Sequence, residues 1–357
     1  MLIAVQIPAI QTFIVKKVIE NFNENKHTNI QLAYFKLRGL SELTLEKLYV
    51  PDERGDTLIY AGSLNVKLNK IALTENRFSL FTVNLDRAKF FLHYDSTGSN
   101  LAFFLAKFAS TEPKDSTEKT KPISLICNNL NITNSTFNYR IDTAKLTPNR
   151  FNPSCFSIKN INLALEEIYI TKDISLKLKN LQAVENSGLA IENFTAGALI
   201  NDTSVVVSEI QLKTALGSMV NWNSLALEFT DWKSFNKFNA EVNLLLNADS
   251  ISEIQLSDIR YFVPEVKDFE ASAKFSGILS GTVSDFSVKK LFISTGKNTA
   301  MTASISATGL PKIEETFLYF DINNLTLSPT DVQELNIPKQ YKAYLKLPKE
   351  IQRLGNL

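Results

Sequence analysis

The sequence predicts a mostly β fold whose long antiparallel strands have one apolar and one polar face. Apolar and polar residues alternate with a period of two along most of the chain. The strand-like segments follow one another at intervals of about 8–14 residues, which is typical of all-β architectures. Asn stands at many of the breaks between them, as expected of turns that use left-handed backbone conformations.

The stretch Leu43–Leu68 is the clearest example of this pattern. A first strand runs to Val50, and Pro51 to Asp56 has the composition of a turn. In the strand that follows, the apolar residues Leu64, Val66 and Leu68 alternate with polar ones. Alternate side chains of a strand point to opposite faces, so this segment predicts a half-buried hairpin.

Two segments have helical rather than strand periodicity. Apolar residues between Ile10 and Phe22 recur at steps of three and four, which predicts an amphipathic N-terminal helix. The same spacing predicts a short helix over Asn100–Phe108. Between the two helices, Arg77–Tyr94 contains two apolar runs, and Asp86-Arg87 is interpreted as a turn that separates them.

The chain is divided here into three parts. Residues 1–110 hold the N-terminal helix and the first strands, residues 111–122 form a polar loop, and residues 123–357 continue the strands. Met1–Pro8 is apolar but shorter than a membrane span, so it is either a strand or the end of a membrane helix that begins before this sequence. The last residues indicate that the chain is cut inside a further unit.

A weak repeat links two segments of the C-terminal half. Leu256–Pro264 resembles Leu327–Pro338, and the aspartates Asp258 and Asp331 lie 73 residues apart. Each segment predicts a short helix that a Ser or Asp caps and a Pro ends.

Composition and motifs argue against several classes of function. The net charge of +1 is unlike that of a nucleic-acid-binding protein. Cys127 and Cys155 lack metal-ligand spacing, and whether they pair is left open. Thr295–Thr299 is only faintly similar to a phosphate-binding loop, because Leu291 stands where its first glycine should be. The G-x-S-x-G and H-E-x-x-H motifs do not occur. We therefore expect no enzymatic activity, no catalytic residues, no cofactor and no metal.

Four segments carry a resemblance to a known family. They are Gln6–Lys17, the Leu43–Leu68 hairpin with Gly55–Gly62, Phe275–Val283, and the repeated Asp-containing helices that end at Pro264 and Pro338. In this order they resemble the N-terminal portion of the AsmA-like/TamB proteins of Gram-negative envelopes, in the form found in Bacteroidetes. The resemblance spreads over essentially the whole chain, and each motif alone is loose.

This resemblance implies a fold and a non-enzymatic function. The fold would be a long twisted antiparallel sheet curled into an open groove of the chorein/AsmA-like, β-taco type, with an N-terminal amphipathic helix and a few short helices. The function would be bridge-like phospholipid transport between the inner and outer membranes. The full-length parent would be periplasmic. It would be anchored to the inner membrane by a further N-terminal helix, which precedes the amphipathic helix and is largely missing here. Its missing C-terminal region would engage an outer-membrane TamA-type β-barrel protein.

Several alternatives remain open at this point. Alternation alone favours a sandwich, in which a second sheet covers the apolar face. If the face is a groove, we expect its lining to include Leu64, Val66, Leu68, Leu176, Leu178, Leu225 and Leu227. A scaffold for the assembly of outer-membrane β-barrels or autotransporters would instead use exposed strand edges. An adhesin would use exposed aromatic residues, whereas Trp222 and Trp232 are predicted to lie in the core.

Overall fold

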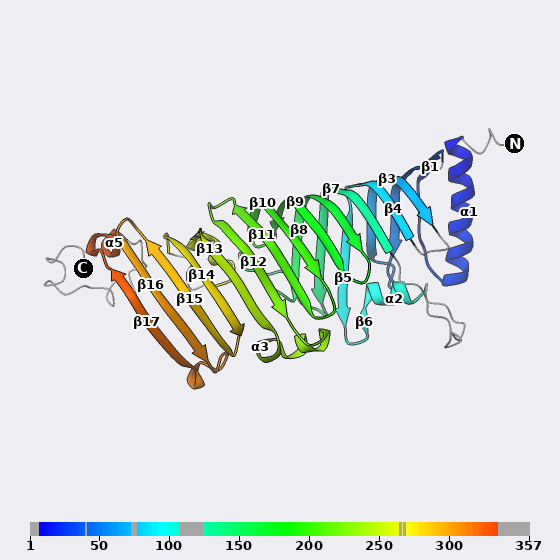
Figure 1. Cartoon of the computed structure of the whole chain (residues 1–357). Helices are drawn as coiled ribbons and strands as arrows, with labels where there is room; N and C mark the ends of the chain where they lie inside the picture. The colour runs from blue at the N-terminus through cyan, green and yellow to red at the C-terminus, as the bar shows by residue number, and fades with distance from the viewer. Residues whose placement is uncertain are drawn as a thin grey trace. The chain divides into compact units, whose positions relative to one another are not determined.

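The computed structural model describes residues 7–39, 41–72, 77–107, 124–263, 266 and 269–334. The chain divides into two compact units, Met1–Gly188 and Leu189–Leu357, called here the N-terminal and C-terminal units. Each unit is mostly β; the N-terminal unit begins with a 19-residue helix, and the other helices are short, so the predicted fold class is confirmed (Figure 1). The predicted loop at residues 111–122 lies outside the described residues.

The N-terminal unit contains the two predicted helices and the predicted hairpin. Its elements are α1 (Pro8–Lys26), β1 (Tyr34–Arg38), β2 (Glu42–Pro51), β3 (Thr57–Ala72), β4 (Arg77–Asp86), β5 (Lys89–Asp95), β6 (Gly98–Ser99), α2 (Asn100–Ala106), β7 (Ser124–Ile141), β8 (Cys155–Ile170) and β9 (Ile174–Glu185). Helix α1 begins at a proline, which suits the first turn, and ends where His27 adopts a left-handed conformation with φ 50°.

The turn predicted at Asp86-Arg87 is wrong. Strand β7 pairs in parallel with both β4 and β5, with Asp86 opposite Thr133 and Lys89 opposite Thr136. The difference in residue number between paired residues is the same on both sides of Arg87. The chain therefore continues in one direction through this point. Arg87 has a φ of 51°, and this single left-handed residue lies between two strands that follow one another end to end.

Similar left-handed residues lie side by side across the sheet of the N-terminal unit. Lys47 in β2, Arg87, Asn134 in β7 and Asn160 in β8 all have a φ between 50° and 53°. The neighbouring position of β3 is Gly62, whose backbone N–H donates to the carbonyl oxygen of Arg87 at 3.3 Å. A left-handed residue interrupts the extended backbone of a strand, so a line of such residues creases the sheet.

The apolar positions change from odd to even numbers between β4 and β5. Next to the crease, Val83 and Leu85 are apolar in β4, and Phe90 and Leu92 are apolar in β5. The register is the same on both sides of Arg87, so no residue is inserted relative to the partner strands; the left-handed residue itself interrupts the alternation, and the apolar positions shift by one beyond it. Asn suits two of these positions, since it tolerates the left-handed region.

The C-terminal unit is a simple antiparallel meander. Its elements are β10 (Ala190–Ile200), β11 (Ser204–Thr214), β12 (Met219–Glu228), η3 (Trp232–Lys237), α3 (Phe238–Glu241), β13 (Asn243–Gln255), α4 (Leu256–Ile259), β14 (Ser272–Thr282), β15 (Asp285–Thr295), β16 (Thr299–Thr308), η5 (Ile313–Glu315), β17 (Phe317–Thr326) and α5 (Pro329–Glu334). Each strand pairs with the next in chain order.

The predicted repeat corresponds to a repeated contact. Asp258 in α4 accepts hydrogen bonds from the hydroxyls of Thr214, at 2.5 Å, and Ser218, at 2.6 Å, at the β11–β12 turn. Asp331 in α5 accepts from the backbone N–H groups of Lys297, at 3.1 Å, and Asn298, at 2.7 Å, at the β15–β16 turn. Each short helix therefore locks the hairpin that lies two strands before it. Pro264 and Pro338 lie outside the described residues.

The segment Thr295–Thr299, which is faintly similar to a phosphate-binding loop, forms this second turn. Its backbone N–H groups do bind an anion, but that anion is the carboxylate of Asp331. A Cβ atom at Gly296 would lie 2.5 Å from Cγ of Asp331, so glycine is required for the close approach. The amides of Lys297 and Asn298 lower the pKa of Asp331, with the amide of Asn298 as the main cause.

Few large side chains are fully buried in either unit. Trp222 is half-buried beside Ala196, Ile210 and Val220, in agreement with its predicted core position. The prediction for Trp232 is wrong, because 51% of its surface is exposed while its ring stacks on Phe235.

Both cysteines are buried and free. Cys155 lies opposite Arg140, which is thirteen positions along β7 from Cys127. At about 3.3 Å per residue the two thiols are roughly 40 Å apart, so they cannot pair.

Candidate functional site

The main candidate site of the N-terminal unit is an apolar row that crosses its strands. Paired residues of neighbouring strands share a face, and the pairing joins apolar residues from β1 to β9. The row consists of Leu37, Leu43, Val66, Val83, Leu130, Leu165 and Leu178. Seven strands at about 4.8 Å spacing make it roughly 29 Å long.

A second apolar row runs beside the first on the same face. It consists of Phe35, Leu45, Leu64, Leu85, Ile132, Leu163 and Leu181. Strand positions two residues apart lie on one face, so the two rows form one continuous apolar band.

The C-terminal unit has a corresponding row across the eight strands, β10 to β17, that the structure describes there. It consists of Ala198, Val207, Leu225, Leu246, Leu279, Val288, Ile305 and Phe320. Leu227 lies two residues from Leu225 and pairs with Val205 and Leu244 on the same face.

The predicted lining residues therefore fall on these apolar faces. Leu64, Val66 and Leu178 belong to the rows of the N-terminal unit, and Leu225 belongs to the row of the C-terminal unit. Leu68 pairs with Leu80, which pairs in turn with Cys127, and so extends the band in the N-terminal unit. Leu176 is two positions from Leu178 in β9, beside the bulge at Glu167.

The side chains of these rows are incompletely covered. Every row residue of the N-terminal unit is half-buried, and none is buried. The row of the C-terminal unit is also half-buried, except that Phe320 at its end is 53% exposed. A sandwich would bury the centre of such rows under a second sheet. Among the described residues of each unit, all strands belong to one sheet.

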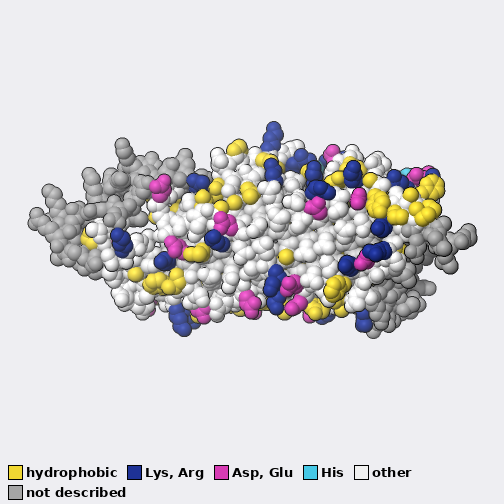
Figure 2. All heavy atoms as spheres, turned by 90° about the horizontal axis from the view of Figure 1, so that it is seen from above, with side chains coloured by type: hydrophobic (Ala, Val, Ile, Leu, Met, Phe, Trp, Pro, Cys, Tyr) yellow, Lys and Arg dark blue, Asp and Glu magenta, His cyan; other side chains and the backbone are white. Residues whose placement is uncertain are grey.

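The opposite face is polar. In the N-terminal unit, the residues that pair between the apolar positions include Thr44, Asn65, Asn84 and Asn131. The Asn131 amide donates to the Asn84 side-chain oxygen at 2.9 Å. On the face visible in Figure 2, charged side chains of both signs are interspersed, which is unlike the basic stripe of a nucleic-acid-binding surface.

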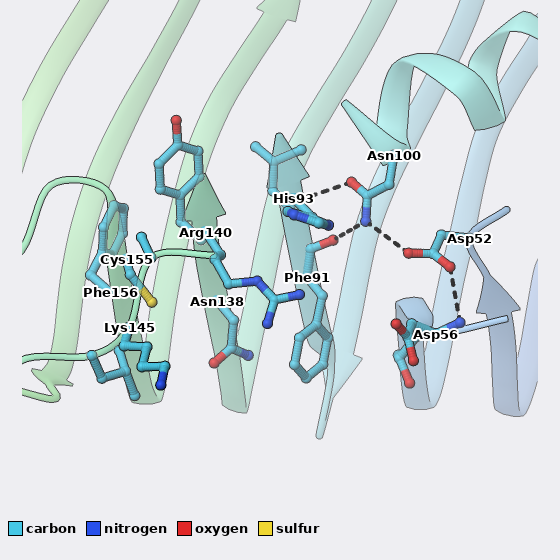
Figure 3. Close-up of a pocket in the computed structure, with 15 residues that line it drawn as sticks. Asp52, Asp56, Phe91, His93, Asn100, Asn138, Arg140, Lys145, Cys155 and Phe156 are labelled. Atoms are coloured by element: carbon cyan, nitrogen blue, oxygen red, sulfur yellow. Dashed lines mark hydrogen bonds between the residues drawn. The ribbon is translucent and has the colours of Figure 1, made fainter. Parts of the chain in front are cut away.

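A second candidate site is a pocket of about 590 Å³ within the N-terminal unit (Figure 3). It lies where β3, β5, β7 and β8 come together with the β2–β3 turn. The register pairs Phe91 with Asn138 and His93 with Arg140, and Arg140 also lies opposite Cys155. Sequence analysis missed this pocket, because its residues come from segments far apart in the chain.

Asn100 holds the strand and turn side of the pocket together. Its side chain is buried, accepts from the backbone N–H of His93 at 3.0 Å and donates to the carbonyl oxygen of Phe91 at 3.0 Å. It also approaches Asp52 at 3.4 Å, and Asp52 in turn accepts from the backbone N–H of Asp56 at 2.9 Å. The turn that carries Asp52 and Asp56 is thereby fixed against β5.

A charged pair borders the same pocket. Arg54 forms an ion pair with Asp95 and lies 3.4 Å from Nδ1 of His93. Hydrogen bonds from the hydroxyl and backbone N–H of Thr97, together with Arg54, lower the pKa of Asp95 to about 2. Asp95 is therefore ionised at neutral pH and holds Arg54 in place.

Comparisons with known proteins identify no relative. No protein-family model matches the chain. No curated protein matches it either. No solved structure matches it. The fold and its apolar rows thus define the class of the molecule: a mostly β protein built on one long, mainly antiparallel sheet with incompletely covered apolar faces.

Two further features of the described residues bear on the sites. In that part of the chain, no helix is both long and apolar enough to cross a bilayer. His, Cys, Asp and Glu side chains do not gather there in groups of three or more that could hold a metal ion.

Proposed function

We propose that this chain is a non-enzymatic phospholipid carrier whose apolar rows hold acyl chains. The observation that carries the proposal is the continuous row from Leu37 to Leu178, whose members are all half-buried. Each CH₂ group removed from water contributes roughly 0.8 kcal/mol, and a row of Leu and Val side chains has no polar group to fix a lipid in one place. Such a surface can hold an acyl chain and let it slide.

The dimensions of the row support this proposal. Half of a bilayer's hydrocarbon core is about 15 Å thick, which is the length that one leaflet's acyl chains span. The row of the N-terminal unit is roughly twice that length. The resemblance to AsmA-like/TamB proteins supports the setting: a periplasmic bridge between inner and outer membranes, with a TamA-type partner for the parent protein.

The alternative, a scaffold for outer-membrane protein assembly, would pair client strands with an exposed sheet edge. In the N-terminal unit, α1 covers the edge at β1. The Gln11 side chain donates to the carbonyl oxygen of Leu37 and accepts from its backbone N–H, both at 2.8 Å. A client strand at this edge would have to displace the helix, so the acyl-chain proposal is favoured.

The test compares one substitution on each face of β3. We expect purified wild-type protein to carry phospholipid, detected by native mass spectrometry and by lipid extraction. Val66→Lys places a charge in the apolar row and should remove most of that lipid. Asn65→Lys, its neighbour on the polar face, is the matched control and should keep it.

Three results would argue against the proposal. Wild-type protein without phospholipid, or a Val66→Lys variant that retains as much lipid as wild type, would contradict it directly. Circular dichroism of both variants gives the third readout. If Val66→Lys unfolds while Asn65→Lys does not, the face is a closed core.

A further inference from the structure

We infer that the pocket of Figure 3 binds a small zwitterion whose anionic group is a phosphodiester and whose cationic group is an ammonium. This pocket contains charged groups of both signs, and they lie on opposite sides of it. Arg140 and Lys145 stand on the β7–β8 side, and Asp52 and Asp56 stand on the turn side. The inference is independent of the acyl-chain proposal, because none of these residues belongs to an apolar row.

The cationic side is free to bind an anion. Arg140 and Lys145 are exposed, and neither side chain forms a hydrogen bond or ion pair within the described part of the chain. Asn138 lies two residues before Arg140 in β7, so it is on the same face of the strand. It lines the same side of the pocket, and its side-chain amide can donate a hydrogen bond. Arg presents a planar set of N–H donors that matches a phosphate, and Lys adds a second positive charge.

The anionic side is held in place by the turn. Asp52 is engaged by the backbone N–H groups of Arg54, at 3.0 Å, and Asp56, at 2.9 Å. These bonds orient the turn and leave the Asp56 carboxylate without a side-chain partner among the described residues. Arg54, the nearest cation of the turn, is occupied by Asp95. Asp56 is thus available to an external ammonium group.

The spacing of the two sides sets the size of the ligand. Asp56 immediately precedes β3, Arg140 is in β7, and β5 lies between these strands. Two strand spacings place the backbones about 10 Å apart, and side chains reach inward from both. The remaining gap suits a molecule whose charges are a few ångströms apart. The β5 residue opposite Arg140 is His93, and the ring of Phe91, two residues before it, adds an apolar surface to the pocket lining.

Phosphoethanolamine-type compounds have this arrangement of charges. They occur as lipid headgroups and as free soluble molecules, and both present the same phosphate and ammonium to the pocket. A phosphodiester that lacks the ammonium would meet the same cationic side but leave Asp56 unpaired. The pocket should therefore discriminate between two phosphodiesters of similar size.

The experiment is isothermal titration calorimetry of the whole chain with two soluble probes. We expect glycerophosphoethanolamine to bind at least about tenfold more tightly than glycerophosphoglycerol, since one charge-assisted contact is lost in the latter. Arg140→Gln should weaken the binding of both probes. Asp56→Asn should weaken only glycerophosphoethanolamine and abolish the preference.

Matched controls and a second arm complete the test. Lys159→Gln, on an exposed position of β8, and Glu53→Gln, in the same turn as Asp56, should bind like wild type. The second arm measures cosedimentation with vesicles. If wild-type protein cosediments with phosphatidylethanolamine-containing vesicles but not with phosphatidylglycerol vesicles, and Arg140→Gln does not cosediment with either, the ligand is a lipid headgroup. Binding of the soluble probe without cosedimentation assigns it to a free zwitterion.

The inference is overturned by any of three results. These are the absence of zwitterion binding in both arms, equal affinity of wild type for the two soluble probes, and unchanged affinity in Arg140→Gln. The comparison of probes uses wild-type protein alone, so it decides the matter even if a variant fails to fold. Loss of lipid in Val66→Lys with unchanged zwitterion binding would separate this pocket from the apolar rows.

Discussion

The side chain of Gln11 pairs with the backbone of Leu37 as a neighbouring strand would. Its amide donates to the Leu37 carbonyl oxygen and accepts from the Leu37 N–H, each at 2.8 Å. Thr12 repeats the arrangement at Phe35, with distances of 2.9 and 3.0 Å. Helix α1 therefore contacts the sheet through polar side chains that form hydrogen bonds with the backbone N–H and C=O groups at the edge of β1. At an edge strand, such groups left unpaired could form hydrogen bonds with a strand of another chain.

Removing this pairing should destabilise the N-terminal unit. Gln11→Ala leaves both backbone groups of Leu37 without their partner, and we expect the free energy of unfolding to fall by about 2 kcal/mol. Urea unfolding measures the change, and amide hydrogen exchange at Leu37 should accelerate. Lys16→Ala, on an exposed position of the same helix, should stay within about 0.5 kcal/mol of wild type. Equal stability of the two variants would show that the amide pairing does not hold the helix.

Gly62 is required where the crease crosses β3. A Cβ atom there would lie 2.9 Å from Cβ of Arg87 and 3.0 Å from the carbonyl oxygen of Asp86. Gly62→Ala should therefore cost about 1–3 kcal/mol of stability through overpacking against Asp86 and Arg87. Thermal unfolding compares it with Ser63→Ala, the adjacent position, which should change stability little. A Gly62→Ala variant as stable as wild type would mean that the backbone at Arg87 can shift freely.

The carboxylate of Asp258 anchors α4 to the β11–β12 turn. Asp258→Ala leaves the hydroxyls of Thr214 and Ser218 buried without their acceptor, and we expect a loss of about 3 kcal/mol. Chemical denaturation, followed through the unfolding transition of the C-terminal unit, would detect this loss of stability. Asp249→Ala, at an exposed position of β13, is the control and should be nearly neutral. The anchoring role is rejected if the two alanine variants unfold at the same denaturant concentration.

Asp331 should make the C-terminal unit sensitive to acid. Its pKa is lower in the folded protein than the value of about 3.9 expected when unfolded. The carboxylate therefore contributes stability above the unfolded pKa, and that contribution is lost as the pH falls through the lowered folded pKa. The stability difference between wild type and Asp331→Asn should be largest near about pH 7 and shrink toward about pH 3.

The same measurement on Asp321→Asn provides the control. Asp321 is an exposed residue of β17, so its replacement should leave the acid sensitivity of the unit unchanged. A stability difference for Asp331→Asn that is constant with pH would show that the turn amides do not favour the ionised carboxylate.

Much of each sheet could be predicted from local sequence. The alternation at Leu64, Val66 and Leu68 fixed which side chains share a face, because strand geometry alone sets that period. The spacing of Asp258 and Asp331 indicated two equivalent short helices. The predicted lining residues lie on the apolar faces for the same reason.

Other features depended on contacts between distant segments. The parallel pairing of β7 with β4 and β5 shows that the apparent turn at Arg87 is a single left-handed residue between two strands that run in the same direction. The shift from odd to even apolar positions was a signal of that residue, but its meaning appears only when neighbouring strands have left-handed residues at the same level.

The sequence by itself determined the strands, their two faces and the two helices of the N-terminal unit, since these follow from periodicity and turn chemistry within a few residues. The tertiary structure decided the crease, the capping of β1 by Gln11, and the pocket between Asp56 and Arg140. The physical reason is that each of these brings together groups from separate segments. Their pairing energy depends on distances that only strand register and helix placement define.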